Sequence, residues 1–278
     1  MYATKNRTTT KIGESSATVL AKTVRDGFEI ITWELVYPRY IHAEFMTHRM
    51  FSRNAASSRA TPTKVLIEQV RNCPVFFDEV RENMRGMVGG GLLNEDEVKK
   101  FREEWVAAAN YAADCAERWV GEHNIAKQTV NRILEPFLPI RTICTATEHA
   151  NFFNLRLAPD AQPEIRSLAE AMLASMEEAE AIESDVHMPY KEYFPEDADD
   201  NNHLATRCLA ACARVSVMRA GDKHSTLAED EEFVERLRKN GHMSPFEHLA
   251  VAIPGVHANF RNWMSWRYIY ENGFKYGL

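Results

Sequence analysis

Residues 47–59 gather the side chains best suited to holding an anionic ligand. The segment contains three arginines, three serines, an asparagine and a histidine. Arginine binds a phosphate through two parallel N–H donors, and serine hydroxyls with backbone N–H groups can satisfy the other oxygens. The segment therefore suits a ligand that carries both a phosphate and an amide-like ring. A polar loop with a helix cap explains the same composition equally well.

Two further arginines lie in compact motifs later in the chain. Arg132 stands in Asn-Arg-Ile-Leu-Glu-Pro (131–136), and Arg156 ends Asn-Phe-Phe-Asn-Leu-Arg (151–156). The run Ala-Gln-Pro-Glu-Ile-Arg follows at 161–166. For Arg156, a surface ion pair with a glutamate of the following helix is the simpler alternative.

The 47–59 segment resembles the signature of flavin-dependent thymidylate synthases, Arg-His-Arg-x-x-Ser-x-Asn-Glu-x-Ser-x-Arg. Thr47 replaces the first arginine of that signature and Ala55 replaces its glutamate. The later motifs are similar to the family's Arg-x-x-x-Pro turn and its Asn-Phe-x-x-Leu-Arg and Ala-Gln-x-Glu-Ile stretches. The signature positions that match are His48, Arg49, Ser52, Asn54, Ser57 and Arg59.

The resemblance implies an activity and a set of site residues. It implies methylation of dUMP to dTMP at C5, with FAD as cofactor and NADPH and methylene-tetrahydrofolate as co-substrates. It also implies a homotetramer with sites at subunit interfaces. The residues implied in FAD binding are His48, Arg49, Asn54, Asn151, Ser216 and His248. Those implied in nucleotide binding are Glu44, Ser57, Arg59, Arg132 and Arg156, of which Arg156 and Ser57 are the catalytic residues.

Two motifs of the C-terminal part resemble family motifs that normally precede the signature. They are Ala-Arg-Val-Ser (213–216) and Gly-His-Met-Ser-Pro-Phe-Glu-His (241–248). We therefore expect a circularly permuted chain, which is tolerated when the original termini lie close together at the surface. Residues 248–267 also look like a degenerate second copy of the signature region. That hypothesis requires the strands near 30–37 and 248–253 to share one sheet, with His248 close to His48.

The two departures from the signature leave the substrate open. Arg53 or Arg39 could compensate for Thr47 and Ala55, or the substrate could differ. The alternatives are a related methylase or hydroxymethylase of another pyrimidine nucleotide, a non-catalytic flavin- or nucleotide-binding homologue, and an unrelated helical scaffold. No cysteine stands in a convincing nucleophile setting, and the resemblance implies that the protein supplies no nucleophile.

The periodicity of apolar residues predicts the elements that position these motifs. Alternation predicts a strand over 28–37 with Ile31, Trp33, Leu35 and Tyr37 on its buried face. The predicted helices cover 39–50, 95–122, 162–184, 203–213, 226–239 and 257–271. Residues 1–18 are expected to be a loose polar arm, and 248–253 a short strand. Thr226 and Glu229 have capping-box spacing, and Gly241 suits the end of that helix.

These elements predict an α/β (α+β) fold, a single domain with a twisted central sheet packed with long helices. Within it, residues 1–194 carry the signature and the Asn-Phe-x-x-Leu-Arg motif. Residues 195–202 form an acidic linker, and residues 203–278 carry the Ser-Pro-Phe-Glu-His motif.

Charge, hydropathy and cysteine spacing limit the kinds of partner and the cell compartment that the sequence allows. The chain has 278 residues and a net charge of -7, which disfavours a nucleic acid polymer because phosphate contacts need clustered basic residues. No apolar run reaches the length of about 18 residues needed to cross a membrane, and the N-terminus has no apolar signal core. We therefore expect a cytoplasmic protein. The five cysteines show no paired spacing, so we expect neither a disulfide framework nor a metal site.

Overall fold

The computed structural model describes residues 9–197, 199–216 and 225–273. Its centre is a six-stranded sheet in the order β1-β2-β3-β5-β4, antiparallel along this path, with β6 paired in parallel to β2. The strands are β1 Thr9–Ile12, β2 Ser15–Arg25, β3 Phe28–Pro38, β4 Ser52–Ala55, β5 Pro139–Ala146 and β6 Ile182–Glu183. The mixed α/β fold predicted from the sequence is confirmed.

The N-terminal segment is not a loose arm from residue 9 onward. β1 pairs with β2 through a tight turn at Gly13, whose φ of +54° lies in the left-handed region that glycine enters without strain. The hydroxyls of Thr9 and Thr18 lie 2.8 Å apart across this pair. The prediction of an arm is therefore wrong here, because a composition rich in threonine suits an edge strand as well as a loop. Residues 1–8 lie outside the described part.

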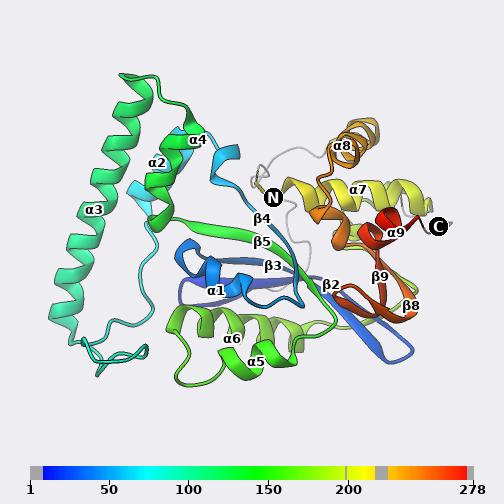
Figure 1. Cartoon of the computed structure of the whole chain (residues 1–278), viewed down its shortest axis with the longest axis horizontal. Helices are drawn as coiled ribbons and strands as arrows, with labels where there is room; N and C mark the ends of the chain where they lie inside the picture. Colours follow the sequence, from blue (N-terminus) through cyan, green and yellow to red (C-terminus); the bar gives the residue numbers. More distant parts are fainter. Residues whose placement is uncertain (1–8, 198, 217–224, 274–278) are drawn as a thin grey trace.

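The strand predicted at 28–37 is confirmed as β3, and its four predicted core residues are all buried in one cluster. Helices α5 (Ala150–Arg156) and α6 (Pro163–Glu178) cover that face of the sheet (Figure 1). The predicted helix 162–184 ends early, because the chain turns extended at Ala179 and then adds β6 to the sheet. Ile182, near the end of the predicted helix, is 46 % exposed.

The opposite face of the sheet is covered by α7 (Asn201–Ala213), which packs on Leu20 and Ile143. Beside it lies α8 (Leu227–Lys239), whose predicted capping box between Thr226 and Glu229 is present. Gly241 follows with φ of +70°, as expected for a helix stop. Both of these predicted helices are confirmed.

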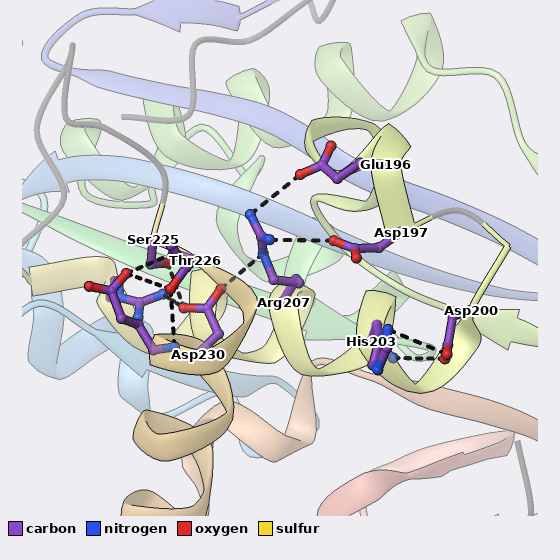
Figure 2. A network of polar contacts seen from close by, with 10 residues as sticks. Glu196, Asp197, Asp200, His203, Arg207, Ser225, Thr226 and Asp230 are labelled. Atoms are coloured by element: carbon purple, nitrogen blue, oxygen red, sulfur yellow. Dashed lines mark hydrogen bonds and ion pairs between the residues drawn. The ribbon is translucent and has the colours of Figure 1, made fainter.

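A buried charge cluster fixes α7 against α8. Asp230 is fully buried, and its carboxylate lies 3.0 Å from Arg207 Nε and 2.6 Å from Arg214 Nη1. Figure 2 shows Arg207 between Asp230 and the acidic residues that precede α7. One of these, Asp197, pairs with Arg207 at 3.4 Å, and Asp200 caps α7. The acidic segment 195–202 is thus held by these contacts, at least at its described residues.

A helical layer stands beyond one end of the central strands, at the left in Figure 1. The predicted helix 95–122 is confirmed as α3, and Asn94 and Glu97 form its capping box. Its C-terminal half packs on the core made with α2 (Thr63–Asn72) and the turn 131–137, and Ala109 is buried there whereas Ala108 is exposed. The other elements of this layer are α2 Thr63–Asn72, α4 Lys127–Val130 and the 3-10 turn η3 Asn131–Phe137.

Two predicted helices are largely wrong. The segment 39–50 forms only the 3-10 turn η1 (Arg39–Ile41) and the short α1 (His42–Met46). The segment 257–271 starts in a hairpin, because Ala258 adopts φ of +52° and sends the chain back as β9 (Phe260–Ser265). Only α9 (Trp266–Asn272), capped by the Ser265 side chain, is helical.

The C-terminal strands form a sheet of their own. β8 (Ala250–His257) pairs with β9 and with β7 (Val186–His187), whereas β3 belongs to the central sheet. The requirement that segments 30–37 and 248–253 share one sheet is therefore not met. The proposed degenerate second copy of the signature region fails on this point, and the permutation stays a hypothesis.

Candidate active site

The signature segment runs from the end of α1, through a turn, into the edge strand β4 and the 3-10 turn η2 (Ser58–Ala60). Arg53 holds the turn, because its Nη1 donates to the carbonyls of Phe45 and His48, each at 3.1 Å. Thr47 donates its hydroxyl to the carbonyl of Glu44 at 2.6 Å and so closes the end of α1. The loop geometry is therefore fixed by the segment's own side chains.

His48 and Arg156 meet in space although they are 108 residues apart in the sequence. Arg156 Nε donates to His48 Nε2 at 2.9 Å. His48 is 8 % exposed and lies edge-on to the ring of Phe152, with centroids 4.8 Å apart. Burial, with the charges of Arg156 and Arg53, lowers the pKa of His48 to about 4. The imidazole is therefore neutral at pH 7, with its proton on Nδ1. Within the described part, Arg156 binds this imidazole rather than a glutamate of α6.

The C-terminal part reaches the signature at β4 and the residues just after it. The backbone N–H of Ser57 donates to Ser216 Oγ at 2.9 Å. The Asn54 amide donates to the carbonyl of Cys212 at 2.8 Å and accepts from Ser244 Oγ at 3.4 Å. Ser216 and Ser57, both predicted site residues, are thus in contact, while the Asn54 amide joins the two parts of the chain.

The turn η3 lies against the loop 56–61. Asn131 is fully buried and donates to the carbonyls of Ser58 at 2.7 Å and Thr61 at 3.0 Å. Arg132 is exposed and donates to Glu135 Oε1 at 2.8 Å. Arg59 is also exposed. Two cations predicted to bind the nucleotide therefore stand on adjoining turns and are open to solvent.

His248 lies inside the protein. It is fully buried, and its Nδ1 lies 2.9 Å from the hydroxyl of Thr145, which is the register partner of Ser52. Burial lowers its pKa to about 3, so the ring is neutral. Nε2 has no hydrogen-bond partner among the described residues.

The remaining predicted site residues differ in how far they are exposed to solvent. Arg49 and Asn151 are exposed, whereas Glu44 is half-buried and its Oε2 lacks a hydrogen-bond partner in the described part. Ala55, at the departure from the signature, packs on the core cluster around Tyr37. A glutamate at 55 would thus meet this apolar cluster, which supplies a physical reason for the small side chain.

The cysteines are poorly placed to act as nucleophiles. All except Cys73 are buried. Burial raises the pKa of the Cys144 and Cys212 thiols, so neither is a thiolate at neutral pH. In the described ranges, no three potential metal ligands gather, and no helix is long and apolar enough to cross a membrane.

Sequence reasoning missed two groups that shape the site. Glu135 stands inside a quoted motif, but its contact to Ser58 crosses 77 residues of chain. His187 belongs to no motif, yet its ring joins Thr23 at 2.8 Å and Thr32 at 2.7 Å, and the Thr32 hydroxyl lies 2.6 Å from that of Thr145. The neighbouring residues of His187 gave no local signal for this contact.

Residues 27–180, more than half of the chain, match the Thy1 family, described as thymidylate synthase complementing protein. The chain belongs to the flavin-dependent thymidylate synthase family. It is therefore a flavin-dependent thymidylate synthase-like enzyme. The matched range holds the signature, η3 and α5, so the family resemblance stated from the sequence is confirmed. Residues 201–273, with Ser216 and His248, lie beyond the matched range.

Solved structures resemble this thymidylate synthase-like chain over part of its length. A UMP/dUMP methylase, PolB, from Streptomyces cacaoi is 19 % identical with a TM-score of 0.44, covering 53 % of this chain and 69 % of its own. The flavin-dependent thymidylate synthase ThyX from Helicobacter pylori, complexed with FAD and dUMP, is 18 % identical with a TM-score of 0.39, covering 53 % and 67 %. A search of curated proteins gives no match.

Proposed function

We propose that the protein methylates dUMP to dTMP at C5, using FAD, with methylene-tetrahydrofolate and NADPH as co-substrates. The observation that carries this proposal is the 2.9 Å contact between Arg156 and His48. Two motifs of the family that are distant in the sequence form one surface here. An unrelated helical scaffold would have no reason to bring them together.

Arg156 is the residue that would polarise the pyrimidine. One of its N–H groups is used on His48, which leaves the two terminal nitrogens of the guanidinium to face a carbonyl oxygen of the ring. Because His48 is neutral, it accepts this bond without cancelling the positive charge of Arg156. Charge that develops on the ring oxygen would then be stabilised by a donor that is already oriented.

The nucleotide phosphate would lie over the exposed cations on the turns η2 and η3. Arg59 and Arg132 would provide bidentate donors there, and Ser57, two residues before Arg59, donates its N–H to Ser216 Oγ. Glu44, whose Oε2 lacks a hydrogen-bond partner among the described residues, would accept a donor of the nucleotide. This arrangement assigns the phosphate to the turns η2 and η3 and the pyrimidine ring to Arg156 at the end of α5.

FAD fits part of the predicted residue set. Arg49 and Asn151 are exposed and could bind the anionic and amide groups of a flavin nucleotide, and Nδ1 of His48 carries a proton to donate. Bound FAD supplies hydride-transfer chemistry. Asn54 and His248 differ, because the Asn54 amide is engaged by Cys212 and His248 is fully buried. We therefore propose that these two support the site from behind.

A second candidate substrate is another pyrimidine nucleotide, such as UMP, with a methyl or hydroxymethyl product. Ala55 favours it, because the carboxylate of the family signature is absent and the position packs on the core. The solved relative PolB is described as a UMP/dUMP methylase. The two candidates share the roles assigned to Arg156 and Ser57. The homotetramer, and the cytoplasmic location, stay predictions.

Tritium release from C5-labelled dUMP and UMP tests the proposal. Release that requires FAD, NADPH and methylene-tetrahydrofolate, followed by product mass, identifies the substrate and the product. Arg156→Ala should abolish release while circular dichroism stays that of the wild type. Near-wild-type release by Arg156→Ala would refute its role. Binding of nucleotide without release from either substrate would indicate a non-catalytic homologue.

A further inference from the structure

We propose that Glu135 is the positioning residue for the nucleotide-binding loop 56–59. This role for Glu135 deepens the proposed function and rests on it. The role differs from direct binding, because Glu135 would act on the nucleotide through Ser57 and its neighbours.

One carboxylate oxygen of Glu135 joins three segments of the chain. Its Oε1 accepts from Ser58 Oγ at 2.5 Å and from Arg132 Nη1 at 2.8 Å, and lies 3.6 Å from Arg39 Nη1. These partners come from η2, η3 and η1 respectively. The Glu135 side chain is 22 % exposed, so its contacts are only partly screened by solvent.

These contacts hold the backbone on both sides of Ser57. On one side Glu135 binds the Ser58 side chain directly. On the other, Arg39 donates to the carbonyl of Ala56 at 3.3 Å while it pairs with Glu135. Ser57 thus stands between two residues that depend on the same carboxylate.

The charge of Glu135 is needed for the second contact. Arg39 is mostly buried, and burial lowers its pKa, an effect that the charge of Glu135 opposes. Replacing the carboxylate by an amide would keep an acceptor for Ser58 but remove the ion pair with Arg39. The guanidinium would then lose the partner that compensates its burial.

Electrostatics and positioning predict opposite results for Glu135→Gln. Removal of a negative charge beside a phosphate site strengthens phosphate binding if charge alone matters. Loss of loop order weakens it. We expect Glu135→Gln to bind dUMP about tenfold more weakly than the wild type, which corresponds to about 1.4 kcal/mol.

Glu79→Gln is the matched control. Glu79 is also 22 % exposed and also pairs with two arginines, Arg81 and Arg166, but it has no described contact with the loop 56–59. Isothermal titration calorimetry with dUMP should give Glu79→Gln the affinity of the wild type. Equal or tighter binding by Glu135→Gln would overturn the inference.

Hydrogen exchange of the amides of residues 56–59 gives a readout that needs no ligand. Exchange should be faster in Glu135→Gln than in the wild type and Glu79→Gln. If the wild type binds neither dUMP nor UMP, the proposed function fails, and exchange alone then decides the role of Glu135. Unchanged exchange in Glu135→Gln would refute it.

Discussion

Lowering the pH from 7 to 5.5 should reduce the free energy of unfolding by about 1 kcal/mol for each of two fully buried neutral histidines. The two residues are His187 and His248, both with 0 % exposure. They are joined by hydroxyls, since His187 binds Thr32, Thr32 binds Thr145, and Thr145 binds His248. Burial lowers the pKa of each imidazole from 6.5 to about 3.

The direction of this pH effect follows from the number of protons that the two histidines bind in the folded and in the unfolded state. Below pH 6.5 both histidines become protonated in the unfolded chain. In the folded chain their imidazoles stay neutral until the pH approaches 3. The stability that these residues contribute is therefore present above pH 6.5 and is lost progressively as the pH falls toward 3. Together the pair should account for a loss of about 2–3 kcal/mol between pH 7 and 5.5.

Urea unfolding at both pH values, for the wild type and for His187→Gln, isolates one of the two contributions. The amide of glutamine can bond to Thr23 or Thr32 but does not titrate. The loss on acidification should therefore be smaller in His187→Gln by about 1 kcal/mol. The exposed His123→Gln serves as the control and should behave as the wild type. An identical pH dependence in His187→Gln and the wild type would refute the reasoning.

Three further changes test the packing that supports the site, each by urea unfolding at pH 7. Asp230→Asn should cost about 3–5 kcal/mol, because it leaves two arginines without their buried carboxylate, while the exposed Glu231→Gln should cost almost nothing. Equal losses in these two variants would contradict the role of the charge cluster. Thr145→Val should cost about 1–3 kcal/mol, because it leaves the buried imidazole of His248 without a partner and removes one of the two contacts of the Thr32 hydroxyl, and a loss near zero would argue against the network. Gly13→Ala should destabilise the β1–β2 turn by about 1 kcal/mol or more, since φ is +54° and a Cβ would lie 2.2 Å from a carboxylate oxygen of Asp78. Unchanged stability of Gly13→Ala would show that the turn can relax.

Local features of the sequence determined much of the fold. The alternation in 28–37 predicted β3, the apolar periodicity of 95–122 predicted α3, and the capping-box spacing of Thr226 and Glu229 predicted α8. These signals are readable because strand and helix periods and cap bonds involve residues within a few positions of one another. The signature spacing likewise identified the family before any fold was known, because a site loop keeps its ligand contacts in a short stretch.

Only the tertiary structure decided which of these elements meet. The contact of Arg156 with His48 crosses 108 residues, and that of Ser216 with Ser57 crosses 159. The segment 257–271 shows the same limit, because its aromatic residues fit a helix or a strand, and pairing with β8 selects β9. Likewise, the sequence could name His248 but could not show that it is buried. Burial and long-range pairing depend on the packing of the whole chain, whereas motifs and periodicities report only what neighbouring residues favour.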